Sequence, residues 1–504
     1  MLQPVFSALL EQGRIVVSGP TRFDAGVRLD GRGIHAGWTW HAGRLTIDRD
    51  RFGVFPLFYS PRPDGIAVSA SVEALLESGV PAALDDAAIA VFLRTGFFVG
   101  EDTPFASIRA VPPCDRWSWT AGDGVSTTPG WRPPRAAALS RKQAIEGFAS
   151  AVTAAVARCL AATSQPVTLP LTGGHDSRHI LFALTELGRV PDRCVTATPY
   201  PPNAPEELTV AAALAAAFGV PHDVLPRRAQ RVAAEREKNQ LTHFCSDEHV
   251  QLLPLRDYFR RRPAAAFDGL AGDVLSQSQR LDPALHRAFG AGNWDAVADR
   301  VLGDETVIES ALRHLLTRRA MQRFNRSLAV GRVAAEAARS AGAPNPIAAF
   351  FFFTRMRREV ALAPYALLDG CQVWTPFLDP DVVELLLSLP FDLVADRRLH
   401  TDTLLTHYPE FAHVPFAGRH QGREDAAAVR REAAALMRLT LSSSSALVDL
   451  PGIAARSARA WLAPTSARVW FLPRIVHLLD VEAIAAGRIS APSPAAAARR
   501  LAAV

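Results

Sequence analysis

The stretch Leu169-Pro170-Leu171-Thr172-Gly173-Gly174-His175-Asp176-Ser177-Arg178 decides the fold. An apolar strand runs into two adjacent glycines, and residues 179–188 then predict a helix with Gly188 at its C′ position. Glycines let the backbone turn tightly and approach a ligand, and a helix start adds partial positive charge. Asp176 in the first turn would repel a phosphate unless a metal ion stood between them. The order Thr-Gly-Gly-x-Asp-Ser therefore predicts an anion-binding loop that works together with a metal ion.

Strands and helices alternate on both sides of this loop. A helix is expected from Ser140 to about Ala162, a strand at 193–198, a helix at 205–219 and a strand at 223–225. This alternation is typical of a doubly wound α/β fold with a parallel sheet and many helices. Ligands of such folds bind beyond the carboxyl ends of the strands, where the two glycines stand.

The first 130 residues predict an α+β domain that is rich in strands. A hairpin turns at Ala42-Gly43 within residues 38–47, and two more strands are expected at 54–59 and 66–70. Helices are expected at 72–79 and 85–96, and residues 117–134, rich in Trp, Thr, Gly and Pro, are interpreted as a linker. We place the domains at 1–135 and 140–425, with a helical C-terminal extension at 426–504.

Composition excludes several classes of protein. The net charge is only +5 over 504 residues, and no dense Lys/Arg run with interleaved aromatics indicates nucleic acid binding. No run approaches eighteen apolar residues, and the N-terminus lacks the pattern of a signal peptide, so we expect no membrane span. Five widely spaced cysteines favour a reduced, cytoplasmic protein.

Five elements in order resemble the asparagine synthetase family of ATP pyrophosphatases, which includes β-lactam synthetases and lasso-peptide cyclases. Residues 172–177 are similar to its Ser-Gly-Gly-x-Asp-Ser pyrophosphate loop, and residues 50–76 resemble its N-terminal glutaminase-like (Ntn-hydrolase-like) domain. The other three elements lie at 205–222, at the second glycine-rich loop 268–276, and at the Pro-Phe-Leu-Asp element within 375–384.

The resemblance implies a reaction and a site. ATP adenylates a substrate carboxylate, pyrophosphate leaves, and an amine displaces AMP to form an amide. Asp176 and Asp273 are expected to share Mg²⁺. The residues expected to bind ATP are Thr172, Gly173, Gly174, Asp176, Ser177, Arg178, Gly269 and Gly272.

Two departures from the family limit this reading. The family's glutaminase domains use a cysteine directly after Met1, but Leu2 stands here, so we interpret the N-terminal domain as degenerate and expect no glutamine hydrolysis. The family also places a lysine near the adenylate, whereas the only lysines here are Lys142 and Lys238. The lysine's role is then empty or falls to an arginine, with Arg419 and Arg423 as the expected catalytic residues and Arg397 and Arg398 as alternatives.

Several residues also have simpler interpretations. Asp379 is expected to cap a turn and the Phe350–Phe353 run to lie in the core. Arg355, Arg357 and Arg358 face either an acidic substrate or solvent, and Gln372 and Trp374 replace a Glu and an Arg of the family.

The sequence therefore predicts an ATP-dependent, amide-forming ligase without glutaminase activity. Its partners would be a small-molecule or peptide carboxylate and ammonia or an amine, in a chain that could form a homodimer. One alternative is a cyclase that closes a lactam or a lasso peptide. Another is a nucleotide-binding protein without catalysis.

Overall fold

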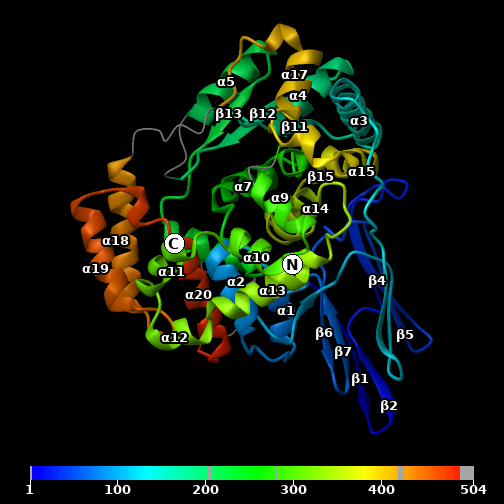
Figure 1. The fold of residues 1–504 in the computed structure, drawn as a ribbon. Helices are drawn as coiled ribbons and strands as arrows, with labels where there is room; N and C mark the ends of the chain where they lie inside the picture. The colour runs from blue at the N-terminus through cyan, green and yellow to red at the C-terminus, as the bar shows by residue number, and fades with distance from the viewer. Residues whose placement is uncertain (1–2, 201–205, 278–280, 418–424, 489–504) are drawn as a thin grey trace.

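The computed structural model describes residues 3–200, 206–277, 281–417 and 425–488, which form a β-rich N-terminal part and a larger α/β part (Figure 1). The N-terminal part holds two antiparallel five-stranded sheets, with strand orders β2-β1-β7-β6-β8 and β10-β9-β5-β4-β3. Their strands are β1 (Val5–Glu11), β2 (Arg14–Ser18), β3 (Arg22–Gly26), β4 (His35–His41), β5 (Arg44–Arg49), β6 (Phe58–Arg62), β7 (Gly65–Ser69), β8 (Arg109–Ala110), β9 (Cys114–Thr120) and β10 (Gly124–Pro129).

The interpretation of residues 117–134 as a linker is wrong up to Pro129, and residues 130–134 lack a helix or strand. Strands β9 and β10 form a hairpin there, and β9 pairs with β5 in the second sheet. Trp117 and Trp119 alternate into the core with Trp38 and are 1% and 5% exposed. The period-two burial of large aromatic side chains therefore outweighs the glycine and proline content that favoured a loop.

The strand predicted at 54–59 begins only at Phe58. The carboxylate of Asp50 accepts hydrogen bonds from the backbone N–H groups of Val54 at 2.8 Å and Phe55 at 2.9 Å. These bonds hold the preceding residues in a turn, because they satisfy N–H groups that would otherwise join a ladder. The hairpin of β4 and β5 and the helices α1 (Val72–Glu77) and α2 (Asp86–Thr95) are confirmed.

The α/β part is built on a parallel sheet with the strand order β13-β12-β11-β14-β15. Helices cover both faces, since β12 contacts both α5 and α7, and its neighbouring residues Cys194 and Val195, which point to opposite faces, lie in separate core clusters, that of Val195 with α7. This confirms the doubly wound fold. The strands are β11 (Val167–Pro170), β12 (Arg193–Ala197), β13 (His222–Leu225), β14 (Ala265–Phe267) and β15 (Gln372–Trp374).

The chain order of these strands reverses between neighbours β11 and β14. The strands that follow β11 add on one side, and those that follow β14 add on the other. The loops after these two strands therefore diverge around a crevice at the carboxyl edge of the sheet, which is the topological switch point where α/β folds bind ligands.

Helices make up most of the remaining α/β part (Figure 1). Up to the middle of the chain they are α3 (Arg141–Ala161), α4 (Asp176–Glu186), α5 (Glu206–Ala217), α6 (Arg231–Leu241), η1 (Val250–Leu252), α7 (Leu253–Arg261), α8 (Gly272–Ser276), α9 (Pro283–Gly290), α10 (Trp294–Leu302), α11 (Glu305–Arg313), α12 (Arg318–Arg323) and α13 (Arg326–Ala338). After these come α14 (Pro346–Phe351), the π-helices η2 (Phe352–Val360) and η3 (Ala363–Leu367), η4 (Pro376–Leu378), α15 (Pro380–Ser388), α16 (Phe391–Val394), α17 (Leu399–His407), η5 (Pro409–Phe411), α18 (Ala426–Ser442), α19 (Leu450–Leu462), η6 (Ser466–Arg468) and α20 (Leu472–Ala485).

Helix α20, from the predicted C-terminal extension, packs against the N-terminal part and so contributes to the interface between the two parts. His477 stacks on Phe92 of α2 at 4.1 Å between ring centroids, and Arg474 donates a hydrogen bond to the carbonyl oxygen of Leu93. Helices α18 and α19 instead lie side by side at the edge of the molecule (Figure 1). The extension is thus partly integral to the fold.

Two buried arginines of η2 hold the parts together. Arg357 donates to the carbonyl oxygens of Gly53 at 3.0 Å and Val111 at 2.9 Å, and Arg358 donates to that of Asp102 at 2.6 Å. Burial, followed by the charge of Arg358, lowers the pKa of Arg357 to about 9. These two guanidinium groups therefore face neither a substrate nor solvent, contrary to both interpretations from the sequence.

Within the described residues, α3 is long and apolar enough to cross a membrane by length and composition. It packs against α4, α15 and α17 inside the α/β part.

Candidate functional site

The two glycine-rich loops meet at the carboxyl edge of the sheet. The backbone N–H of Asp273, in the first turn of α8, donates a hydrogen bond to Oδ2 of Asp176 at 3.1 Å. The two carboxylates expected to share a metal ion thus lie on adjoining loops.

The loop of Gly173 and Gly174 leads into the start of α4, which has no side-chain cap among the described residues. His175, the N-cap residue, makes no capping hydrogen bond; its Nε2 lies 2.8 Å from Oγ1 of Thr401, and its ring stacks on Phe416. The first N–H groups of a helix have no intrahelical acceptor and take one from water, a side chain or a ligand. An uncapped start beside a glycine turn is suited to bind an anion.

Thr172 and Ser177 shape this loop from within. The N–H of Thr172 donates to Oγ of Ser177 at 3.0 Å, and the N–H of Gly174 donates to Oγ1 of Thr172 at 3.3 Å. The carbonyl oxygen of Gly173 accepts the N–H of Ala417 at 3.0 Å. A Cβ at Gly173 would lie 2.6 Å from Cβ of Ala417, so this close approach requires glycine.

The contacts of Arg178 differ from the prediction that it binds ATP. Its guanidinium donates to the carbonyl oxygens of Val414 at 2.9 Å and Pro415 at 2.6 Å and lies over the ring of Phe416. The residue is only 2% exposed. Arg178 therefore fixes the segment 414–416 over the loop, because its donors are directed at main-chain carbonyls.

Gly269 and Gly272 allow the second loop to approach the first. A Cβ at Gly269 would lie 2.6 Å from Cβ of Asp176, and one at Gly272 would lie 2.7 Å from Cγ of the same residue. These glycines, predicted to bind ATP, lie at the site, and their missing side chains make room for the Asp176 carboxylate.

The carboxylates fit a divalent cation. Oδ1 of Asp176 is buried without a donor in hydrogen-bonding geometry among the described residues. Burial, and then the charge of Asp273, raise the pKa of Asp176 well above its usual value. Mg²⁺ prefers oxygen ligands and would offset this repulsion, so Asp176 and Asp273 are the residues that would hold it.

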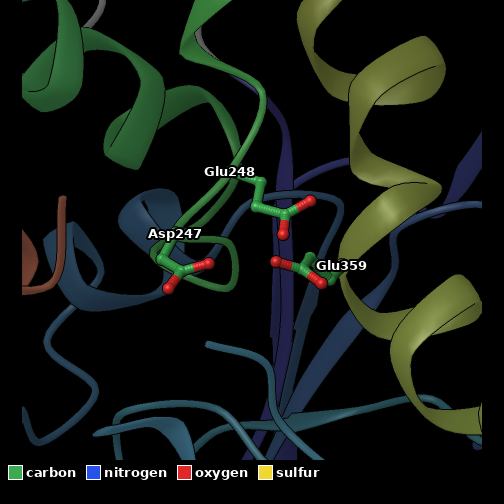
Figure 2. A group of neighbouring side chains, drawn as sticks. All are labelled: Asp247, Glu248 and Glu359. Carbon is green, nitrogen blue, oxygen red and sulfur yellow. The ribbon is translucent and has the colours of Figure 1, made fainter. Parts of the chain in front are cut away.

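The carboxylates of Asp247, Glu248 and Glu359 form a cluster (Figure 2). The charge of Asp273 acts on Arg355, which pairs with two of them. Asp247 and Glu248 precede η1, and Glu359 comes from η2; in Figure 2 the carboxylates of Glu248 and Glu359 face one another. Arg355 pairs with Glu248 at 3.1 Å and with Glu359 at 3.2 Å, and Arg474 pairs with Asp247 at 2.7 Å.

These pairings identify the cluster as an ion-pair network. Its carboxylates already share two guanidinium groups, so a metal ion would have to displace them. Although burial lowers the pKa of Arg355, the charges of Glu359, Glu248 and Asp273 raise it above its usual value. The members of this network share no sequence motif, so it could not be predicted from the sequence.

Neither lysine of the chain reaches the site. Lys142 is 86% exposed on α3, and Lys238 is buried in α6, where its Nζ donates to the carbonyl oxygen of Ser246 and pairs with Glu235. Arg397 donates to the carbonyl oxygen of Leu281, and Arg398 pairs with Asp402. Arg419 and Arg423, the predicted catalytic residues, lie outside the described residues.

Gln372 lies at the opposite edge of the sheet. It pairs with Ala265 at the amino ends of β15 and β14, and its Oε1 lies 3.2 Å from Oγ1 of Thr163. The replacement of the family's Glu at this position therefore does not alter the described site. Asp379, as expected, caps α15, and its side chain also pairs with Arg32 and Arg158.

The fold and the site define a doubly wound α/β protein with an anion-binding loop and paired carboxylates at its switch point. The asparagine synthase family matches residues 147–399, and the glutamine amidotransferase domain family matches residues 26–131. The chain belongs to the asparagine synthase family, since that match covers half of it, and the domain supports an ATP-dependent, amide-forming ligase. A search of curated proteins finds no significant match.

Proposed function

We propose that the protein adenylates a substrate carboxylate with ATP, releasing pyrophosphate, and transfers the acyl group to ammonia or an amine, without hydrolysing glutamine. The observation that carries this proposal is the hydrogen bond between the two glycine-rich loops, which places Asp273 beside Asp176 next to the uncapped start of α4. In the first step a carboxylate oxygen attacks the α-phosphorus and the bond to pyrophosphate breaks. In the second the amine nitrogen attacks the acyl carbon and AMP leaves.

The chain's own residues would bind and orient the phosphates. The N–H groups at the start of α4 would donate hydrogen bonds to a phosphate, and the positive end of the helix dipole would attract its charge. Thr172 and Ser177 keep the loop in shape, and Arg178 fixes the segment 414–416 against it. Mg²⁺, held by Asp176 and Asp273, would neutralise charge on the departing pyrophosphate.

The absence of glutamine hydrolysis is supported by the cysteines. The first cysteine of the sequence is Cys114, which is buried in β9, and burial raises the pKa of its thiol. A buried, protonated thiol is a poor nucleophile. We therefore propose that the N-terminal part stabilises the fold, through its carbonyl contacts with Arg357 and Arg358, and that the nitrogen comes from free ammonia or an amine in the cytoplasm.

ATP–pyrophosphate exchange tests the proposal. Wild type, Asp176→Ala and the surface control Asp295→Asn would be assayed with a panel of carboxylic acids. At least one acid should support exchange in wild type and the control but not in Asp176→Ala. The proposal fails if no acid gives exchange that depends on Asp176. A parallel assay with glutamine should release no glutamate.

A second candidate is a nucleotide-binding protein without catalysis. The positions of the lysines favour it, because neither Lys142 nor Lys238 can reach the adenylate. ATP binding without AMP formation on any acid would support this candidate. Formation of a cyclic product from one molecule that carries both groups would instead identify a cyclase.

A further inference from the structure

A buried chain of hydrogen bonds runs beneath the phosphate loop. Nδ1 of His179 lies 3.0 Å from Nε2 of His400, and Nδ1 of His400 lies 3.0 Å from Oγ of Ser276 and 3.5 Å from Oδ1 of Asp176. The Ser276 hydroxyl donates to the carbonyl oxygen of Gly272 at 2.6 Å. His179, His400 and Ser276 are each 0% exposed.

The contacts assign the protons in this chain. Since Ser276 donates to Gly272, its oxygen accepts from His400, so His400 carries its proton on Nδ1. Its Nε2 is then an acceptor for Nδ1–H of His179. This leaves Nε2 of His179 without a proton, and that nitrogen is the ring atom buried without a partner among the described residues. The reverse assignment would bury an unpaired N–H there, at a cost of about 1–3 kcal/mol.

With this assignment His400 donates its Nδ1–H to Oγ of Ser276, and the same nitrogen also lies near Asp176. The carboxylate thus has a neighbour at each oxygen: Oδ2 accepts the N–H of Asp273 at 3.1 Å, and Oδ1, which accepts no hydrogen bond among the described residues, lies in electrostatic contact with Nδ1 of His400 at 3.5 Å. The imidazole is buried and packs against the rings of Phe148 and Phe377, with centroids at 5.0 Å and 5.7 Å, and these contacts restrict its rotation.

We propose that His400 is a positioning residue that orients the Asp176 carboxylate for the metal ion of the ATP site. The inference rests on the proposed function and adds a residue that no motif of the sequence identifies. His400 acts through Asp176, and Ser276 and His179 fix its tautomer. Such outer contacts change metal affinity by about 10–100-fold when they are removed.

The test compares side chains that keep or move the N–H. His400→Asn retains an N–H near the position of Nδ1, whereas His400→Gln places it near Nε2 and His400→Leu has none. Mg²⁺ would be titrated into each variant with a fluorescent, non-hydrolysable ATP analogue, and anisotropy would report binding. Melting temperatures without Mg²⁺ report folding. His286→Asn, whose ring stacks on Phe391 away from the loop, controls for the loss of a packed imidazole.

We expect the Mg²⁺ midpoint of His400→Asn and His286→Asn to stay close to wild type, and that of His400→Gln and His400→Leu to rise about 10–100-fold. If His400→Leu does not fold, the comparison of His400→Asn with His400→Gln still tests whether the N–H at the position of Nδ1 is needed. The inference is overturned if the His400→Gln variant binds Mg²⁺ like wild type, or if the His400→Asn variant loses as much Mg²⁺ affinity as His400→Gln. If wild type shows Mg²⁺-dependent nucleotide binding and ATP–pyrophosphate exchange, and the His400→Gln variant is unimpaired, only this inference fails. If wild type shows neither, the proposed function fails as well.

Discussion

The backbone N–H of Asp273 donates to Oδ2 of Asp176 at 3.1 Å, and this bond joins the loops that follow β14 and β11. The two strands are neighbours at the point where the strand order reverses. The crevice that forms there brings together carboxylates separated by almost a hundred residues of sequence. The bond is therefore a direct consequence of the topology, and the close approach that it needs depends on small residues.

Gly272→Ala should separate the two loops. Its Cβ would lie 2.7 Å from Cγ of Asp176, so the carboxylate or the backbone has to move. We expect a loss of stability of about 1–3 kcal/mol, as for other overpacked sites, together with weaker Mg²⁺-dependent nucleotide binding. Denaturant unfolding and binding of the ATP analogue measure both effects.

Gly331→Ala is the matched control. Gly331 lies within α13, where an added Cβ meets nothing within 4 Å. Because alanine is the better helix former, this variant should be more stable by about 0.5–1 kcal/mol, with unchanged nucleotide binding. Equal effects of the two substitutions would contradict the role given to Gly272.

Arg357→Met should weaken the joint between the N-terminal and α/β parts. It leaves the carbonyl oxygens of Gly53, Gly100 and Val111 without this donor in a buried interface. We expect a loss of about 3 kcal/mol in the free energy of unfolding, measured in urea. Arg116→Met, on the exposed face of β9, should change it by less than about 0.5 kcal/mol. Equal unfolding free energies of Arg357→Met and Arg116→Met would contradict the role of Arg357 in holding the two parts together.

The elements that the sequence predicts correctly depend on local or topological rules. The helix of residues 86–95 follows from the cap at Asp85, and the meeting of the two loops follows from alternating strands and helices. The partner of Arg178 could not be predicted, because Val414 and Pro415 are more than two hundred residues away and offer only main-chain oxygens.

The same limit applies to His400 and to the network around Arg355. A histidine or an arginine on a helix has no periodic or spacing signal that reveals which loop it faces. The hairpin of β9 and β10 was missed for another reason. Its tryptophans alternate as strand residues do, but the neighbouring glycine and proline residues favour the interpretation as a linker.

Glu73 should make stability depend on pH. It is 5% exposed in α1, and Oε1 has no partner among the described residues. Burial, and then Glu77, raise its pKa from 4.5 to about 8. The folded protein therefore holds this proton up to about pH 8 while the unfolded chain releases it near 4.5, so stability is full below 4.5 and falls as pH rises to 8.

The resulting loss in the free energy of unfolding is on the order of 5 kcal/mol between pH 4.5 and pH 8. Glu73→Gln removes the titration, and its unfolding free energy should decline less over the same range than that of wild type. Glu146→Gln, at a half-exposed position on α3, should follow wild type. Parallel profiles of wild type and Glu73→Gln would show that Glu73 titrates normally in the folded protein.

Arg355→Gln should destabilise the protein through a carboxylate that it leaves behind. Glu359 is 1% exposed, and burial, Glu248 and Asp247 raise its pKa well above the usual value even with Arg355 beside it. Removing the guanidinium takes away the compensating charge. Breaking a fully buried ion pair from one side costs about 3–5 kcal/mol, and because the Arg355 side chain is itself 34% exposed we expect a smaller loss of about 1–3 kcal/mol. Arg300→Gln, which breaks the exposed pair with Asp282, should cost less than about 1 kcal/mol.

Urea unfolding at neutral pH compares Arg355→Gln with Arg300→Gln, and the double variant Arg355→Gln/Glu359→Gln should recover part of the loss in stability. A double variant no more stable than Arg355→Gln alone would contradict the assignment, because the penalty would then not come from the unpaired carboxylate of Glu359.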